Sequence, residues 1–156
     1  MVHPEEEKIL KKISVKSPTF ENNKPIPAKY TCDGADVNPP LTVDDVPEET
    51  KTLVLIVDDP DAPAGTFNHW LVWNIPPTTR KIEENTVPGT EGINTSRKHS
   101  YDGPCPPHGT HRYIFKVYAL DTQLQLKSNA NKRDVEKAMK AHVLAEGELM
   151  GLYTRT

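Results

Sequence analysis

Cysteine is scarce in this sequence, since only Cys32 and Cys105 occur among 156 residues. Two cysteines are too few for a disulfide-rich scaffold, and the absence of CxxC spacing excludes a cysteine zinc site and a thioredoxin-type redox motif. We therefore expect two free thiols. A single bridge between them is left open as the alternative, because the spacing alone does not decide it.

Long apolar runs are also missing from the chain. The longest, residues 53–57 (LVLIV), is far shorter than the ~20 apolar residues of a membrane-spanning helix. The N-terminal segment MVHPEEEKILKK contains no apolar stretch like the core of a secretory signal. These absences predict a cytoplasmic protein without a transmembrane segment.

A basic surface is the third missing feature, because 19 Lys and Arg residues stand against 22 Asp and Glu residues, for a net charge of −3 at pH 7. Proteins that bind nucleic acid usually carry a basic face, so we expect no nucleic-acid partner. The GxSxG nucleophile elbow and the GxxxxGK(S/T) phosphate loop are absent as well. Esterases built on that elbow and P-loop enzymes therefore have no support.

Proline, in contrast, is abundant. The 15 prolines are nearly twice the average usage of about 5%, and a proline inside a helix removes a hydrogen bond and clashes with the preceding turn. Long helices are thus disfavoured, whereas 156 residues are enough to enclose one hydrophobic core. We predict a single, mainly β domain over residues 1–156, with residues 1–13 as a peripheral extension.

Apolar and β-branched runs predict where the strands lie. Residues 53–57, 70–75 and 112–120 have this character, and a final strand is expected around residues 149–153. The first run is apolar throughout, which indicates a strand buried on both faces. The run over residues 112–120 alternates, which places every second side chain on the same face.

Two helices are expected, one near each end of the chain. A short N-terminal helix is predicted over residues 4–13, where Pro4 stands in the first turn. One C-terminal helix is predicted to begin after Asn131, with Asp134 three residues later as an approximate capping box. The apolar stripe of this helix reaches His142, which we interpret as a buried histidine.

Four polar residues stand at the ends of the predicted strands: Asp59, His69, His111 and Tyr113. If residues 53–57 and 70–75 pair as antiparallel strands, Asp59 and His69 lie at the same end of the sheet. His111 begins the third strand, and Tyr113 points the same way as His111 because strand side chains alternate. The sequence therefore predicts a pocket formed by these four side chains, at strand ends where binding sites are often built.

These residue types suit a small anion. Imidazoles donate N–H hydrogen bonds, a neighbouring carboxylate favours the imidazolium form, and a tyrosine hydroxyl is another donor. Residues 103–107 (GPCPP) contain three prolines, which have no N–H. Gly103 and Cys105 are therefore the backbone donors that this segment can offer to an anion.

Several of these segments together resemble one known family. The strings DPDAP (59–63), HW (69–70), YDGPCPP (101–107) and GTHRY (109–113) resemble the phosphatidylethanolamine-binding protein family, also called Raf kinase inhibitor protein-like. YTCDG (30–34), NPPL (38–41) and HVLA (142–145) resemble its short bacterial and archaeal branch. The resemblance covers residues 14–154.

The resemblance implies a fold and a set of site residues. The fold is an antiparallel, Greek-key-like β-sandwich, and the pocket takes phosphate, acetate or phospholipid head groups. The four pocket residues named above match family pocket positions, Phe67 and Pro107 match wall positions, and the backbone of Cys105 matches an anion-contacting position. Asp61 and Arg112 match motif residues that we assign to structure, paired with each other.

The expected function is that of a non-enzymatic binding protein that uses no cofactor and no metal and has no catalytic residues. Its ligand is a small anion or a phosphorylated ligand, and its role is regulatory. One alternative is a protease or kinase inhibitor that acts through the exposed loops 59–68 and 85–110. Another is a metal-dependent enzyme that uses His69 and His111, or His108 and His111 with Asp59. The resemblance is also compatible with a homodimer. A further alternative is that both histidines are only polar residues that cap strand ends and bind no ligand.

Overall fold

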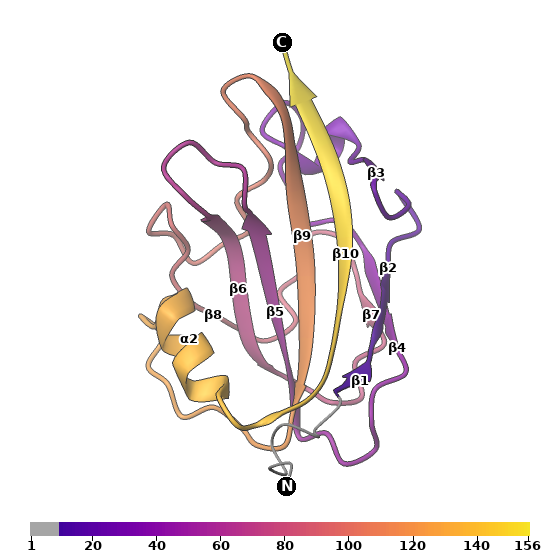
Figure 1. The fold of residues 1–156 in the computed structure, drawn as a ribbon, viewed down its shortest axis with the longest axis vertical. Coiled ribbons are helices and arrows are strands. Elements are labelled where there is room, and N and C mark those ends of the chain that lie inside the picture. The colour runs from indigo at the N-terminus through magenta and orange to yellow at the C-terminus, as the bar shows by residue number, and fades with distance from the viewer. Residues whose placement is uncertain (1–9) are drawn as a thin grey trace, which may run out of the picture.

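The computed structural model describes residues 10–156, which form two β-sheets and one α-helix (Figure 1). The larger sheet has the strand order β1-β10-β9-β5-β6-β8, with β3 beside β10, and the smaller sheet has the order β2-β4-β7. In chain order the elements are β1 (Lys11–Lys12), β2 (Ser14–Lys16), β3 (Lys24–Pro25), the 3-10 turn η1 (Ala28–Tyr30), β4 (Leu41–Asp44), β5 (Thr52–Asp59), β6 (Phe67–Ile75), β7 (Lys81–Ile82), β8 (Thr90–Glu91), β9 (Gly109–Leu120), α2 (Lys132–Met139) and β10 (Val143–Arg155).

The strand β5 lies in the middle of the larger sheet, and all its residues are buried. Leu55 and Val57 pack in the core between the two sheets, whereas Val54 and Ile56 pack on the opposite face, in a second core that includes Val135 of α2. In Figure 1, α2 lies beside the lower part of β6. The predicted burial of β5 on both faces is confirmed, and so is the mainly β sandwich.

The strands β9 and β10 are the longest in the described chain and form an antiparallel pair. Along β9, burial alternates as the sequence predicts, with Tyr113 and Phe115 buried and Ile114 between them half-buried. Both strands are longer than predicted. The added residues at the start of β9, such as Gly109 opposite Arg155, are held by backbone pairing and give no apolar signal, whereas β10 also takes in the apolar residues 143–145, which follow the predicted helix in the sequence.

The short helix predicted over residues 4–13 is wrong where it can be compared with the structure. Residues 4–9 lie outside the described part of the chain. Lys11 and Lys12 form strand β1, which pairs in parallel with Ala145 and Glu146 of β10. The backbone of β10 offers these residues hydrogen-bond partners, and this tertiary pairing outweighs the local helical pattern.

The C-terminal helix α2 begins as predicted. Asn131 accepts a hydrogen bond from the N–H of Asp134, and the Asp134 side chain accepts one from the N–H of Asn131, which completes the capping box. The helix ends at Met139, earlier than expected, and His142 is half-buried with its Nδ1 bonded 2.7 Å from Oδ1 of Asp121. No helix in the described part of the chain has the length and apolar character needed to cross a membrane.

Candidate functional site

Three strand ends meet at one end of the molecule, at the top of Figure 1. β5 ends at Asp59, which pairs with Phe67 at the start of β6, and β9 begins nearby at Gly109. A pocket of about 250 Å³ opens there. It is lined by Asp59, Ala62, Pro63, Phe67, His69, Asp102, Gly103, Cys105, Pro106, Pro107, His111 and Tyr113. The structure thus brings together all eight residues that the sequence proposes for ligand binding.

Asp59 holds one of the two pocket histidines in place. Its side chain is almost completely buried; Oδ2 lies 2.7 Å from Nδ1 of His111, and Oδ1 accepts a hydrogen bond of 2.7 Å from the N–H of Asp61. A carboxylate only accepts, so Nδ1 of His111 is the protonated donor. The other ring nitrogen, Nε2, makes no hydrogen bond to any residue between 10 and 156 and is the atom that remains for a ligand.

His69 is fixed differently, because its Nδ1 donates to the backbone carbonyl of Asp102. The Asp102 N–H in turn donates to the carbonyl of His69, 3.0 Å away. Burial lowers the pKa of His69, and the charge of Asp102 and its hydrogen bond oppose this only in part. We expected both imidazoles to donate to an anion. The donor nitrogen of His69 is instead already used within the protein.

Tyr113 lies between the two histidines. Its ring meets that of His69 edge-on, with centroids 5.3 Å apart, and stacks on that of His111 at 6.5 Å. Burial, the negative charge of Asp59 and a hydrogen bond from the hydroxyl to the Asp59 carboxylate raise the pKa of Tyr113, while the Cys105 N–H directed at the hydroxyl opposes the rise. Tyr113 therefore keeps its proton at neutral pH and can act as a donor.

Gly103 contributes to the pocket wall and not, as expected, an N–H for the ligand. Its N–H donates to Oδ1 of Asp36 at 2.8 Å and is already satisfied. A Cβ at this position would lie 2.6 Å from the carbonyl oxygen of Tyr30, so only glycine allows so close an approach. The remaining backbone donor of this segment is the N–H of Cys105, which points toward the hydroxyl of Tyr113 in the pocket.

The two cysteines form a disulfide, so the expectation of free thiols is wrong. The Cα atoms of Cys32 and Cys105 are 5.5 Å apart, and the N–H of Cys32 donates to the carbonyl of Pro104. The two residues are separated by 73 positions in the sequence, and only the folding of η1 against the loop before β9 brings them together. The bridge fastens the pocket wall to the rest of the molecule.

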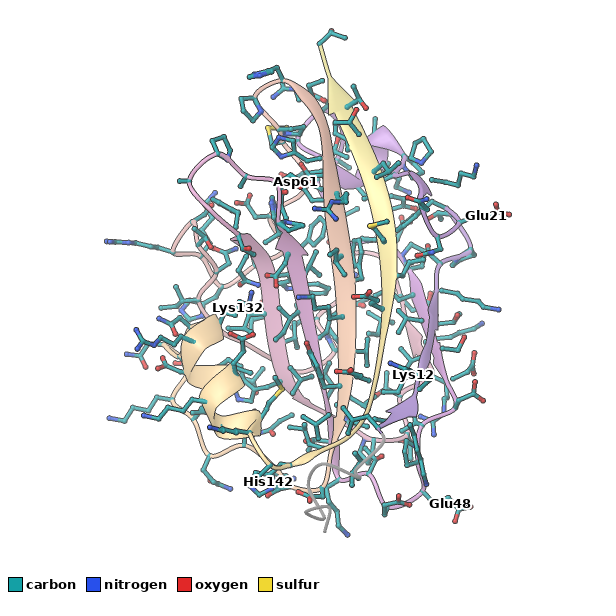
Figure 2. The ribbon with its side chains drawn as sticks, viewed as in Figure 1. Lys12, Glu21, Glu48, Asp61, Lys132 and His142 are labelled. Atoms are coloured by element: carbon teal, nitrogen blue, oxygen red, sulfur yellow. A yellow bond between two sulfur atoms is a disulfide. The ribbon has the colours of Figure 1, made fainter. Side chains whose placement is uncertain are left out.

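Asp61 and Arg112 pair with each other at the rim of the site. Asp61 accepts hydrogen bonds of 2.9, 2.8 and 2.9 Å from Nε, Nη2 and the backbone N–H of Arg112. This pairing lowers the pKa of Asp61 to about 2. Figure 2 labels Asp61 at the same end of the molecule as the pocket, and the pair fixes the β5–β6 loop against the start of β9.

Asp102 is the pocket residue that sequence reasoning missed as a functional group. It stands in the string YDGPCPP, but its role is to accept a hydrogen bond from His69 through its backbone carbonyl oxygen. A pattern of side chains does not reveal such a contact. His108, one of the candidate metal ligands, is exposed and does not line the pocket. Within residues 10–156, no three His, Cys, Asp or Glu side chains are grouped as a metal site.

Comparison with known proteins identifies the family. The model of the family described as phosphatidylethanolamine-binding protein matches residues 16–154. A UPF0098 protein of Pyrococcus horikoshii is 52% identical over 155 residues, which cover 92% of this chain and 78% of the relative. A UPF0098 protein of Methanothermobacter thermautotrophicus is 48% identical, with 92% of this chain and 99% of the relative covered.

Two solved structures share the fold. A putative phosphatidylethanolamine-binding protein homolog from Chlamydia trachomatis superimposes with a TM-score of 0.90 at 40% identity, covering 93% of this chain and 99% of the other. YbcL of E. coli, described as a member of the mammalian PEBP family, gives a TM-score of 0.85 at 30% identity with the same coverage. The chain therefore belongs to the phosphatidylethanolamine-binding protein family.

Proposed function

We propose that this protein is a non-enzymatic binding protein whose pocket takes a phosphate-like or carboxylate group, carried by a regulatory ligand. The observation that carries the proposal is the buried Asp59–His111 pair, which presents the free Nε2 of His111 to the pocket. A carboxylate partner compensates the charge of an imidazolium, and a charged donor binds an anion more strongly than a neutral one. The hydroxyl of Tyr113 and the N–H of Cys105 lie beside it.

The size of the pocket fits a small group and not a large ligand. Its volume of about 250 Å³ is below the range of roughly 300–1,000 Å³ typical of sites for drug-sized molecules. An isolated anion makes few contacts and binds weakly. The anionic group is therefore best placed at the end of a larger molecule, such as a phosphorylated ligand or a phospholipid head group.

The lining residues lack a hydroxyl, thiol or amine nucleophile poised for covalent catalysis, which favours a binding role. They include no serine, threonine or lysine, and the one cysteine among them, Cys105, is part of the disulfide. A covalent mechanism would need a nucleophile with an adjacent base. The only hydroxyl in the lining belongs to Tyr113, and the raised pKa of this group disfavours its nucleophilic form.

A protease or kinase inhibitor remains the second candidate. The tip of the β5–β6 loop is exposed at residues 63–66, and Val87, in the 85–110 loop, exposes 57% of its surface. An exposed apolar side chain on a loop is suited to contact with a protein partner. If the protein is such an inhibitor, Val87→Asp should abolish inhibition in a protease panel and leave anion binding unchanged.

We also propose the cytoplasmic location that the sequence predicts. The disulfide limits the kinds of cytosol in which this location is possible. Cytosolic proteins rarely keep disulfides, except in hyperthermophiles. The bridge between Cys32 and Cys105 would thus require a cytosol of that kind. Alkylation of thiols in intact cells, followed by mass spectrometry, tests this: both cysteines unmodified supports a stable bridge, whereas two alkylated cysteines show that the cytosol reduces it.

The anion pocket is tested by replacing His111 with asparagine. Asparagine keeps a donor near the position of Nδ1 for Asp59 but removes Nε2. We expect NMR titration with phosphate to show an affinity at least tenfold weaker, because hydrogen bonds to charged groups contribute roughly 1.5–3 kcal/mol. His142→Asn is the matched control, because His142 lies at the opposite end of the molecule from Asp61 in Figure 2. Unchanged affinity in His111→Asn would contradict the proposal.

A further inference from the structure

The two pocket histidines present different chemistry to a ligand. His111 bonds to a carboxylate, but His69 bonds to the carbonyl oxygen of Asp102. A carbonyl oxygen can only accept a hydrogen bond, so Nδ1 of His69 must carry a proton. In the neutral ring this leaves Nε2 unprotonated, and Nε2 then acts as an acceptor.

Nε2 of His69 is open to the pocket. It has no hydrogen-bond partner among residues 10–156, and it is not among their fully buried, unpartnered polar atoms. The ring of Phe67 packs against that of His69, with centroids 4.7 Å apart, and His69 is buried. Burial is the main reason that the pKa of His69 is lowered, which favours the neutral ring.

The charged and titratable groups around His69 come from three elements. They are Asp58 and Asp59 on β5, Asp102 in the loop before β9, and His111 and Tyr113 on β9. The carboxylates favour protonation of His69, but burial outweighs them. The Asp102 carboxylate is itself held by the hydroxyl of Ser96 at 2.6 Å.

The charge of the lining limits the charge of the ligand. Asp59 and Asp102 are acidic, and no lysine or arginine lines the pocket. A dianion would therefore enter a lining that contains acidic residues and no lysine or arginine to offset its second charge. A singly charged anion is better suited to this lining.

We propose that the pocket selects an anion that brings its own hydrogen-bond donor, namely a phosphomonoester in its singly protonated form. This inference rests on the proposed function and names the ligand class of the same site. The P–OH of the monoester donates to Nε2 of His69, while its unprotonated oxygens accept from Nε2 of His111. A phosphodiester and sulfate carry no such donor and leave the acceptor on His69 unpaired.

The proposal separates two sources of phosphate. The phosphate that links a phospholipid to an alcohol head group is a diester, which carries no P–OH at neutral pH, whereas the phosphate of a phosphorylated side chain is a monoester. The second pKa of a phosphomonoester is about 6, so the singly protonated form is abundant at pH 6. Methyl phosphate and dimethyl phosphate are therefore suitable probes, because their monoanions differ by one methyl group in place of the proton.

The test compares methyl phosphate, dimethyl phosphate and sulfate at pH 6.0 and fixed ionic strength, with affinities from NMR titration. We expect methyl phosphate to bind at least roughly tenfold more tightly than either of the others, because an unpaired buried acceptor is costly. Equal affinity for the monoester and the diester would overturn the inference but leave the anion pocket standing. Binding of none of the three would overturn both.

A variant of His69 gives a second readout. His69→Asn keeps a donor near the position of Nδ1 for the Asp102 carbonyl and removes Nε2. We expect the ratio of the two dissociation constants, diester to monoester, to fall toward one in this variant and to stay unchanged in His142→Asn. An unchanged ratio in His69→Asn, or a ¹⁵N spectrum of the wild-type protein in which Nε2 of His69 carries the proton, would also overturn the proposal.

Discussion

Asp58 and Asp59 are neighbours at the end of β5, but they face opposite sides of the larger sheet, and both are almost completely buried. Asp58 accepts hydrogen bonds from the ammonium groups of Lys132, at 2.6 Å, and Lys116, at 3.4 Å. Its other oxygen accepts from the side-chain amide of Asn68 at 3.1 Å. In Figure 2, Lys132 is labelled at the upper end of α2, on this outer side of the sheet.

The two carboxylates differ in what their partners leave free. The ammonium groups of Lys132 and Lys116 contact the carboxylate of Asp58 directly and tie α2 and β9 to the end of β5. Asp59 instead holds His111, whose second nitrogen remains available, beside a pocket. A buried carboxylate thus acts as a structural tie when it neutralises cations on neighbouring elements, and as part of a site when it orients a ring whose second nitrogen faces a pocket.

The first way to sharpen this comparison is to remove the disulfide. Cys105 lines the pocket together with Asp59, whereas Asp58 does not line it. In the double variant Cys32→Ala, Cys105→Ala, the free energy of unfolding should fall by about 4 kcal/mol, as loop-closure entropy predicts for a separation of 73 residues. Denaturant titration measures this loss. In the folded variant, phosphate affinity should also fall, because the wall from Cys105 to Pro107 loses its covalent anchor.

The second prediction compares the same substitution, aspartate to asparagine, at each of the two carboxylates. Asp58→Asn should lower the free energy of unfolding by about 3 kcal/mol, because it leaves two lysines without their buried counter-charge. Phosphate affinity should change by less than about twofold, since Asp58 does not line the pocket. Asp59→Asn should show the reverse pattern, with affinity lost and a smaller loss of stability. The comparison fails if both variants lose affinity equally.

The smallest effect is expected at the rim, for Asp61→Asn. The pair with Arg112 is partly exposed, with side-chain exposures of 30% for Asp61 and 50% for Arg112, so its loss should lower stability by no more than about 1 kcal/mol. The folded-state pKa of Asp61 is lowered to about 2, below the usual value of about 3.9. This contribution is therefore present above about pH 4 and is lost as the pH falls toward 2. Thermal unfolding of both proteins at pH 7 and pH 2 measures the difference.

The sequence predicts those parts of this molecule that local patterns encode. The apolar run of β5 and the alternation of β9 mark two central strands, and their ends bring Asp59 and His111 together. The capping box of α2 is local as well. In these elements the local residue pattern favours the same secondary structure and the same buried face that the fold adopts. The pattern alone is therefore enough to predict them.

The remaining features depend on contacts between distant segments. The bridge from Cys32 to Cys105 requires η1 and the loop before β9 to meet, and the use of the Gly103 N–H depends on where Asp36 lies. The carbonyl of Asp102 sets the tautomer of His69, and backbone atoms leave no signature in the residue pattern. The same holds for β1, whose lysines pair with β10 in spite of a helical pattern.

The strands β1 and β3 have a consequence for association between molecules. Both are two residues long and pair in parallel with β10, where the larger sheet would otherwise end in a long open edge. β1 consists of two exposed lysines and β3 of an exposed lysine and a proline, residue types that discourage another strand from joining. Association between molecules by continuing the larger sheet across its β10 edge is therefore disfavoured.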